Sequence, residues 1–203
     1  MGTRMRRVLI AVAAAAVAIA VGVRIWWVNA TFPWIPHEYY EQGEWVALEG
    51  CFHYDADSEP TQDYSVKVER VTVMTYDEYM SAYGENPEEI GKHGDQRSVV
   101  CVDLVIRNDG DEKGGFLLIE ALLTPGRGNE CLQLDMFSDI SLWPHHSGIA
   151  ADPRTERLVH VPYVINAPDD GAYANPIEDR EFTLLVSQMP VRKMIRITVE
   201  DTA

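Results

Sequence analysis

The segment from Ser98 to Arg107, with the sequence SVVCVDLVIR, is the clearest indication of the fold. Successive side chains of a β-strand point to opposite faces, so apolar residues at every second position predict a strand with one face in a core. The apolar face consists of Val100, Val102, Leu104 and Ile106. The other face is mixed and carries Cys101, Asp103, Val105 and Arg107. Its charged members indicate that Cys101 lies outside the deep core.

The residues on either side of this strand extend the β pattern. Asn108–Asp111 is a turn signal, because Asn and Gly tolerate positive φ. The apolar run Gly115–Leu123 then predicts a second buried strand, paired with the first as a hairpin. Upstream, Tyr64–Val68 alternates, and Val71–Val73 continues on the opposite parity. A shift of one residue exposes the wrong face, so we expect a β-bulge near Glu69.

The remaining chain contains more short strands and one helix. Thr75 and Glu78 form a capping box, which predicts a short helix at Tyr76–Tyr83. Short strands separated by turns predict an all-β fold, an immunoglobulin-like β-sandwich with this one helix inserted. The absence of a fixed-period repeat excludes solenoids and propellers. The further expected strands are Glu44–Phe52, Cys131–Met136, Arg157–Ile165, Glu181–Ser187 and Arg192–Glu200.

The N-terminus carries a predicted transmembrane helix, Val8–Val28, whose 21 residues would span about 31 Å. The hydrocarbon core of a bilayer is about 30 Å thick. The residues that indicate an interface at its outer end are Arg24, Trp26 and Trp27. The residues that place the N-terminus in the cytoplasm, by the positive-inside rule, are Arg4, Arg6 and Arg7. A cleaved signal peptide is the alternative, although its apolar region usually has only about 7–15 residues.

These features divide the chain into a cytoplasmic basic tail (1–7), the transmembrane helix (8–28), a juxtamembrane spacer (29–43) and an extracytoplasmic sandwich domain (44–203). Pro33 and Pro36 indicate that the spacer is extended. From Thr31 onward, 13 basic and 32 acidic residues give a net charge of −19, because four of the chain's 17 basic residues and none of its acidic ones come earlier. A domain this acidic repels phosphate backbones, which excludes a nucleic-acid partner.

Three cysteines, Cys51, Cys101 and Cys131, stand in a domain expected in an oxidising compartment. Two of them could form a disulfide, with the pairing left open by the sequence, or all three could be small buried thiols. The weak candidates for a metal site are Asp55, Asp57 and Asp63, which are hard oxygen ligands of the kind that calcium prefers. Their loop lacks the Gly and the closing Glu of an EF-hand, so a solvated acidic loop is favoured over a metal site. The histidines, which we interpret as isolated or unsupported as ligands, are His37, His53, His93, His145, His146 and His160.

Four stretches resemble uncharacterised bacterial immunoglobulin-like ectodomains that follow a membrane anchor or a lipoprotein signal. They are VVCVDLVIRNDGDE (Val99–Glu112), YSVKVERVTV (Tyr64–Val73), LVHVPYVINAP (Leu158–Pro168) and the FTLLV and IRITV strands of Phe182–Val199. The segment Tyr76–Gln96 departs from that pattern, and the Cys…Trp…Cys spacing of antibody domains is missing. The resemblance implies a β-sandwich outside the cytosol and no particular activity.

The sequence contains no G-x-S-x-G elbow, phosphate-binding P-loop or H-E-x-x-H helix, so we expect no enzyme and no cofactor. The favoured function is a non-catalytic binding or surface-interaction module in the cell membrane. Its partners would be membrane lipid, through Val8–Val28, and an extracellular or envelope protein. The alternatives are a calcium-responsive surface domain and a wall- or glycan-directed hydrolase that uses a pair of carboxylates.

Overall fold

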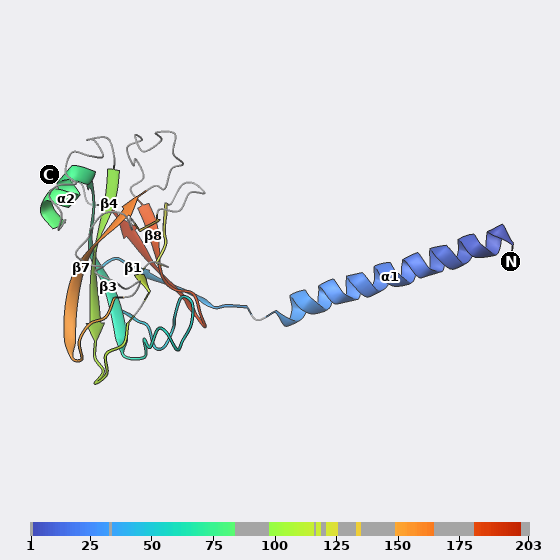
Figure 1. The fold of residues 1–203 in the computed structure, drawn as a ribbon, viewed down its shortest axis with the longest axis horizontal. Coiled ribbons are helices and arrows are strands. Elements are labelled where there is room, and N and C mark those ends of the chain that lie inside the picture. Colours follow the sequence, from blue (N-terminus) through green and yellow to red (C-terminus); the bar gives the residue numbers. More distant parts are fainter. Residues whose placement is uncertain are drawn as a thin grey trace. The chain divides into compact units, whose positions relative to one another are not determined.

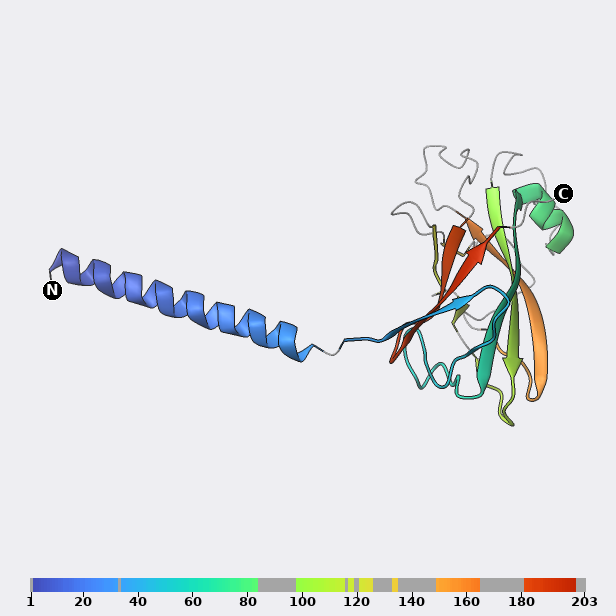
Figure 2. The same cartoon turned by 180° about the vertical axis from the view of Figure 1, so that it is seen from behind.

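The computed structural model of the chain describes residues 2–32, 34–83, 98–115, 117–118, 121–125, 133–134, 149–164 and 181–199. It divides into two compact units, Met1–Trp34 and Ile35–Ala203. The first unit is a single helix and the second is a β-sandwich with one short helix. Figures 1 and 2 show both units from opposite sides.

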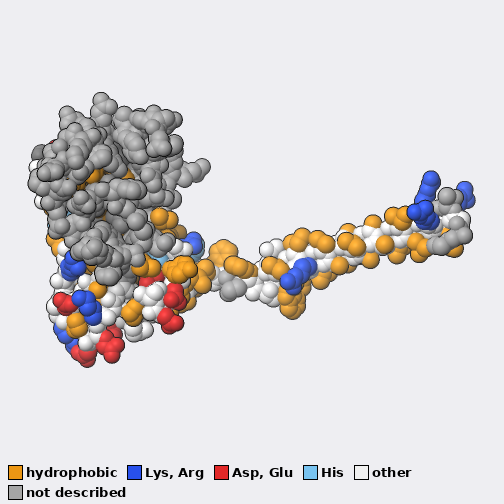
Figure 3. Space-filling model, in the orientation of Figure 1, with side chains coloured by type: hydrophobic (Ala, Val, Ile, Leu, Met, Phe, Trp, Pro, Cys, Tyr) orange, Lys and Arg blue, Asp and Glu red, His pale blue; other side chains and the backbone are white. Residues whose placement is uncertain are grey.

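The first unit is the helix α1 (Thr3–Thr31), which at 29 residues is about 44 Å long. Its span Arg4–Thr31 contains an 18-residue window with a mean hydropathy of 2.6, and none of that window is buried. Hydrophobic side chains cover it in Figure 3, with arginines near both ends. By length and composition it could cross a membrane or serve as a signal sequence. The helix contains the predicted apolar span Val8–Val28 and continues beyond it at both ends.

The second unit consists of two packed sheets. One has the strand order β1 (His37–Glu41), β9 (Arg192–Thr198), β8 (Glu181–Ser187), β5 (Leu123–Pro125). The other has the order β2 (Val46–Ala47), β3 (Tyr64–Thr75), β4 (Ser98–Asn108), β7 (Thr155–Val164), β6 (Gln133–Leu134). β1 and β9 pair in parallel, and the other strand pairs are antiparallel. The predicted fold class, an all-β sandwich with one short helix and an apolar N-terminal helix, is confirmed.

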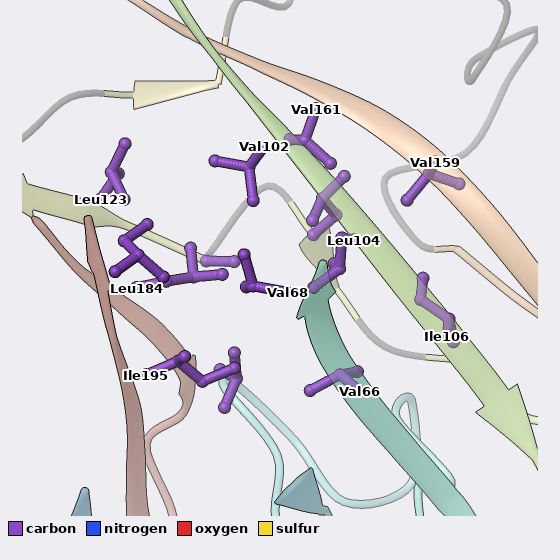
Figure 4. Packing of buried hydrophobic residues seen from close by; sticks show 14 of the residues in the cluster. Val66, Val68, Val102, Leu104, Ile106, Leu123, Val159, Val161, Leu184 and Ile195 are labelled. Carbon is purple, nitrogen blue, oxygen red and sulfur yellow. The ribbon is translucent and has the colours of Figure 1, made fainter. Parts of the chain in front are cut away.

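The core lies between the two sheets, where the alternating apolar residues meet. Leu104 and Ile106 of β4 are fully buried and point toward Leu184 of β8 and Ile195 of β9 (Figure 4). β3 contributes Val66 and Val68, and β7 contributes Val159 and Val161, to the same cluster. This is the face of Ser98–Arg107 that the period-two pattern predicted.

Two local predictions are confirmed in detail. The bulge lies between Val68 and Arg70, where β3 changes register against β4. The helix α2 (Tyr76–Tyr83) follows β3 directly, and its capping box is formed. The Glu78 carboxylate accepts hydrogen bonds from the backbone N and the hydroxyl of Thr75, and Thr75 Oγ1 accepts one from Glu78 N. These bonds lower the pKa of Glu78 and satisfy backbone donors at the start of the helix.

The predicted boundary between spacer and domain is wrong. Residues 37–41 of the expected 29–43 spacer form β1, which pairs with β9 from His37↔Arg192 to Glu41↔Arg196. Arg192 N also donates a hydrogen bond to Pro36 O at 2.8 Å. The prolines correctly predicted an extended segment. The expectation that this segment pairs with no strand was wrong, because an extended segment with free backbone groups can add to an open sheet edge. The domain therefore begins before residue 44.

The predicted hairpin between Ser98–Arg107 and Gly115–Leu123 is also wrong. β4 pairs with β3 and β7, while β5, which begins at Leu123, pairs with β8 in the other sheet. Leu118 and Leu123 are nevertheless buried in the core, as expected for an apolar run. Hydrophobic pattern reports burial, whereas the identity of the neighbouring strand depends on the path of the chain.

Three other predicted strands are shorter than or shifted from the expected ranges. Glu44–Phe52 contains only β2 and an isolated bridge from Phe52 to Met189. Arg157–Ile165 corresponds to β7, and Arg192–Glu200 to β9. Glu181–Ser187 matches β8 in full. Of Cys131–Met136, the described part is β6, and Cys131 lies outside the described residues.

Candidate functional site

The outer face of the five-stranded sheet carries a second apolar cluster beneath α2. Because α2 follows β3 without a loop, it packs against β3 and β4 at the edge of the sandwich (Figure 1). Cys101 of β4 belongs to this cluster and is 1% exposed, so the expectation that it lies outside the deep core is wrong. The whole cluster is Tyr76, Tyr79, Met80, Val99, Cys101 and Val164.

A charged group lies beside this cluster, centred on Asp103. Three adjacent strands bring it together, because Asp103 of β4 lies opposite Arg70 of β3 on one side and His160 of β7 on the other. The bulge is essential to this placement. Glu69 has no partner in the register, so Arg70 lies on the outer face beside Asp103, and Val71 returns to the core.

The two carboxylate oxygens of Asp103 have different partners. Oδ2 accepts a hydrogen bond from Arg70 Nε at 3.0 Å and forms an ion pair with Arg70 Nη2 at 2.9 Å. Oδ1 lies 2.7 Å from Nδ1 of His160 and accepts a long contact of 3.9 Å from the Cys101 thiol. The carboxylate is 9% exposed, and the cationic partner compensates the charge that burial would otherwise penalise. The ion pair raises the pKa of Arg70.

Helix α2 fixes His160 from above. The Tyr83 ring stacks on the imidazole with 3.9 Å between centroids and 16° between planes. Tyr79 donates a hydrogen bond from its hydroxyl to the backbone oxygen of His160 at 2.7 Å. The imidazole therefore has a defined orientation, with its Nδ1 directed at Asp103.

The group contains a cysteine, a histidine and an aspartate, but it does not form a nucleophilic site. Burial, followed by the negative charge of Asp103, raises the pKa of Cys101 to about 12. The sulfur is thus a thiol at neutral pH, and only the thiolate is a strong nucleophile. Its lack of exposure also leaves a substrate no access. What the group does offer is three ligand atoms, from Cys101, Asp103 and His160, that all lie within 4.8 Å of one another.

In the predicted acidic loop, the buried carboxylate is that of Glu59, and it binds backbone N–H groups. Glu59, 1% exposed, accepts hydrogen bonds from the backbone N of His53, Tyr54 and Leu117 at 2.8–3.1 Å. Asp55 and Asp57 are exposed, and Asp55 accepts a hydrogen bond from Ser58 N at 3.2 Å. Among the described residues these aspartates and Asp63 do not form a group of close ligand atoms.

The third aspartate, Asp63, lines a pocket of about 140 Å³. Glu112, Lys113 and Tyr64 also border it, so two carboxylates face one hollow. The Tyr64 hydroxyl is already engaged, donating to Ala151 O and accepting from Gly114 N. The pocket is about half the smallest volume usual for ligand sites, about 300 Å³. It is too small for the sugar ring that the hydrolase alternative requires.

Of the other predicted site residues, those that the structure describes do not belong to the group around Asp103. Cys51 and Cys101 are both free, buried thiols, so no disulfide joins them. His37 is exposed on β1, and His53 is buried. The residues that lie outside the described part of the chain are Cys131, His93, His145 and His146.

Sequence reasoning missed Arg70 and His160 and treated His160 as isolated. The alternation did place Cys101 and Asp103 on one face of their strand. It could not show which residues of β3 and β7 lie opposite, because that depends on strand pairing and on the bulge. The available signal was Asp103 itself, a charged residue between the apolar Cys101 and Val105 on one strand face.

The family of the chain follows from its match to a family model. The model of a domain of unknown function, DUF5028, matches residues 37–193, more than half of the chain. The chain belongs to this family. The match begins at the first residue of β1, in agreement with a domain that starts before residue 44. Among curated proteins, none matches this sequence.

Solved structures similar to this DUF5028 chain include three proteins from two bacteria. The yjhA protein of Bacillus subtilis is 11% identical, with 79% of this chain and 99% of that chain covered and a TM-score of 0.40. An uncharacterised β-sandwich protein of Clostridium difficile 630 is 10% identical, with coverages of 81% and 97% and a TM-score of 0.39. The ycdA protein of Bacillus subtilis is 13% identical, with a TM-score of 0.40 and 68% of this chain covered. The chain spans 37% of the ycdA chain's length.

We predict that the Asp103 ion pair contributes more to stability than an exposed pair of the same kind. Arg70→Gln leaves a buried carboxylate without its cation and should lower the free energy of unfolding by about 1–3 kcal/mol. Arg154→Gln is the matched control, because Arg154 binds Asp111 at 2.8 Å with side-chain exposures of 67% and 84%. It should cost less than about 1 kcal/mol. Urea unfolding of the full chain in detergent measures both, and equal losses would contradict the prediction.

We predict that His53 makes stability depend on pH. Burial lowers the pKa of His53 from 6.5 to about 4, against the opposing effect of Glu59. The unfolded chain then takes up a proton below about pH 6.5 that the folded chain refuses until about pH 4. Above pH 7 His53 is neutral in both states and does not lower the free energy of unfolding. As the pH falls through this window, the free energy of unfolding decreases by up to about 3 kcal/mol.

The measurement is the free energy of unfolding between pH 7.5 and pH 4.5. His53→Gln should flatten the decrease, and His37→Gln, which changes an exposed histidine, should not. An unchanged slope in His53→Gln would show that other groups cause the pH dependence.

Proposed function

We propose that this DUF5028 protein is a single-pass membrane protein whose acidic β-sandwich lies outside the cytosol and binds a protein partner without catalysing a reaction. The observation that carries the proposal is the span Arg4–Thr31 of α1, which is long and apolar enough to cross a membrane and has none of its most apolar part buried. An exposed apolar surface of that length is stable in a bilayer and unstable in water. The three arginines at its start favour a cytoplasmic N-terminus.

The anchor is tested by fractionating a bacterial host that expresses the chain with a C-terminal epitope tag. We expect the full-length chain in the membrane pellet after alkaline carbonate extraction, and loss of the tag when protease is added to intact spheroplasts. A variant with Val12, Val17 and Ile19 changed to Asp should move to the soluble fraction. Recovery of the unmutated chain as a shorter soluble form that lacks α1 would show a cleaved signal instead.

The described part of the domain supports binding better than catalysis. Its Cys101 thiol is buried and protonated, and the pocket that Asp63 lines is too small for a sugar ring. Connecting segments at the ends of the sheets remain, and these are where sandwich folds usually place contacts.

One end of the domain has the features of a contact surface. Tyr54 is 80% exposed and Met189 is 41% exposed, and both lie near the bridge that joins Phe52 to Met189. Exposed carboxylates, Asp55 and Asp57, follow Tyr54 in the same loop. An aromatic residue and a methionine with charged neighbours resemble the apolar centre and polar rim of protein interfaces. The acidic rim favours a partner whose own surface is basic.

A photo-crosslinking amino acid at Tyr54 tests this surface in the native membrane of the source cell. We expect it to capture one defined envelope protein, whereas the same group at Leu158, a residue of β7 with 48% exposure, should not. Asp55→Asn with Asp57→Asn should reduce the yield, and so should high salt. Capture from both positions alike, or from neither, would contradict binding through this end.

A further inference from the structure

We infer that Cys101, Asp103 and His160 form a binding site for one transition-metal ion of the Zn²⁺ class. The three residues offer sulfur, oxygen and nitrogen, which are the ligand atoms that zinc binds in proteins. They come from two adjacent strands, β4 and β7, and their ligand atoms all lie within 4.8 Å of one another. Calcium and magnesium prefer oxygen alone, so the thiol selects against them.

The distances are close to those of a coordinated ion. Zinc bonds of about 2.0–2.3 Å in a tetrahedral site separate neighbouring ligand atoms by about 3.3–3.6 Å. Asp103 Oδ1 lies 2.7 Å from His160 Nδ1 and 3.9 Å from Cys101 Sγ. One separation is shorter than required and the other is longer, so small rotations of the side chains would bring both into range.

The two oxygens of the Asp103 carboxylate have different partners. Arg70 occupies Oδ2, and Oδ1 faces the sulfur and the imidazole. A metal ion at Oδ1 would therefore leave the Arg70 ion pair in place. In known metal sites, hydrogen bonds of this kind orient the ligating groups and raise affinity.

Protons and charges balance when the ion binds. The metal replaces the thiol proton of Cys101, which leaves to solvent, and bonds to the resulting thiolate. Nδ1 of His160 gives up the proton that it donates to Asp103 Oδ1, and the imidazole binds the ion as the neutral tautomer with its proton on Nε2. Thiolate, carboxylate and a divalent ion sum to zero, so Arg70 and the site together carry one positive charge. Water would complete the coordination, as in zinc sites with three protein ligands.

The site is enclosed on one side and accessible on another. Cys101 and Asp103 are buried, whereas the His160 side chain is 30% exposed and offers an entry path. Tyr83 stacks on the imidazole, and Tyr79 bonds its backbone oxygen, so α2 holds this ligand in a fixed orientation. A preorganised histidine lowers the entropy cost of binding the ion.

Cobalt(II) is the probe, because a cobalt–thiolate bond gives a near-ultraviolet charge-transfer band and tetrahedral coordination gives strong visible bands. The reduced, metal-free full chain in detergent is titrated with Co²⁺, and zinc is then added. We expect both sets of bands to saturate at one equivalent and to be lost when zinc displaces cobalt. A titration without a thiolate band at millimolar Co²⁺ would overturn the inference.

The three cysteines provide a matched control. The double variant Cys51→Ser with Cys131→Ser keeps Cys101 as its only thiol and should retain the charge-transfer band. Cys101→Ser should lose it, and His160→Asn should weaken binding at least tenfold. Arg70→Gln, which removes the bond that orients the Asp103 carboxylate and leaves the three ligand residues in place, should weaken binding by about 10–100-fold. A band that survives in Cys101→Ser, or disappears in the double variant, would assign the metal to another thiol.

X-ray absorption of the zinc-loaded unmutated chain gives a readout that does not depend on the folding of any variant. We expect one sulfur at about 2.3 Å with nitrogen and oxygen at about 2.0 Å. A shell of nitrogen and oxygen alone would overturn the inference and leave Cys101, Asp103 and His160 as a hydrogen-bonded group.

Discussion

A carboxylate on a strand that is buried on both faces is the constraint on which the outer half of this domain depends. β4 lies in the middle of its sheet, with the core on one side and α2 on the other, so Asp103 has little access to water. A buried charge must be paired and hydrogen-bonded. Arg70 meets that requirement only because the bulge in β3 turns its side chain outward. The bulge thus places the cation that compensates the buried carboxylate of Asp103.

The sequence predicts local elements well where one periodicity dominates. The alternation of β4 identified its core face, the parity change between Val68 and Val71 located the bulge, and the Thr75–Glu78 pair fixed the start of α2. It could not give the neighbours of a strand, because burial follows from composition and pairing follows from the path of the chain. The same limitation hid the candidate site. The alternation placed Cys101 and Asp103 on one face of the strand. The positions of α2 above them and of His160 beside them depend on the tertiary structure, which the alternation does not show.

The segment at the start of the domain has no apolar pattern of its own and becomes a strand by pairing with β9. His37–Glu41 is mostly exposed and polar, yet it forms five register pairs with β9. A buried lysine strengthens the same region, since the Lys193 ammonium, 2% exposed, donates to Ala47 O at 2.6 Å and to Glu49 at 3.0 Å. Lys193 belongs to one sheet, and Ala47 belongs to the other. Its hydrogen bond to Ala47 O therefore joins the two sheets close to the point where the chain enters the domain.

The candidate site and the proposed binding role place different demands on the same fold. A binding surface requires exposed side chains at the ends of the sheets, whereas a metal site requires rigid ligands on paired strands. The domain separates these two regions, with Tyr54 and Met189 near the Phe52 bridge and with Cys101 and His160 under α2. A metal ion that links β4 to β7 would stabilise the folded state without covering the exposed end, because binding to the native state alone shifts the folding equilibrium. Metal binding and partner binding can then coexist, and neither requires the domain to act as an enzyme.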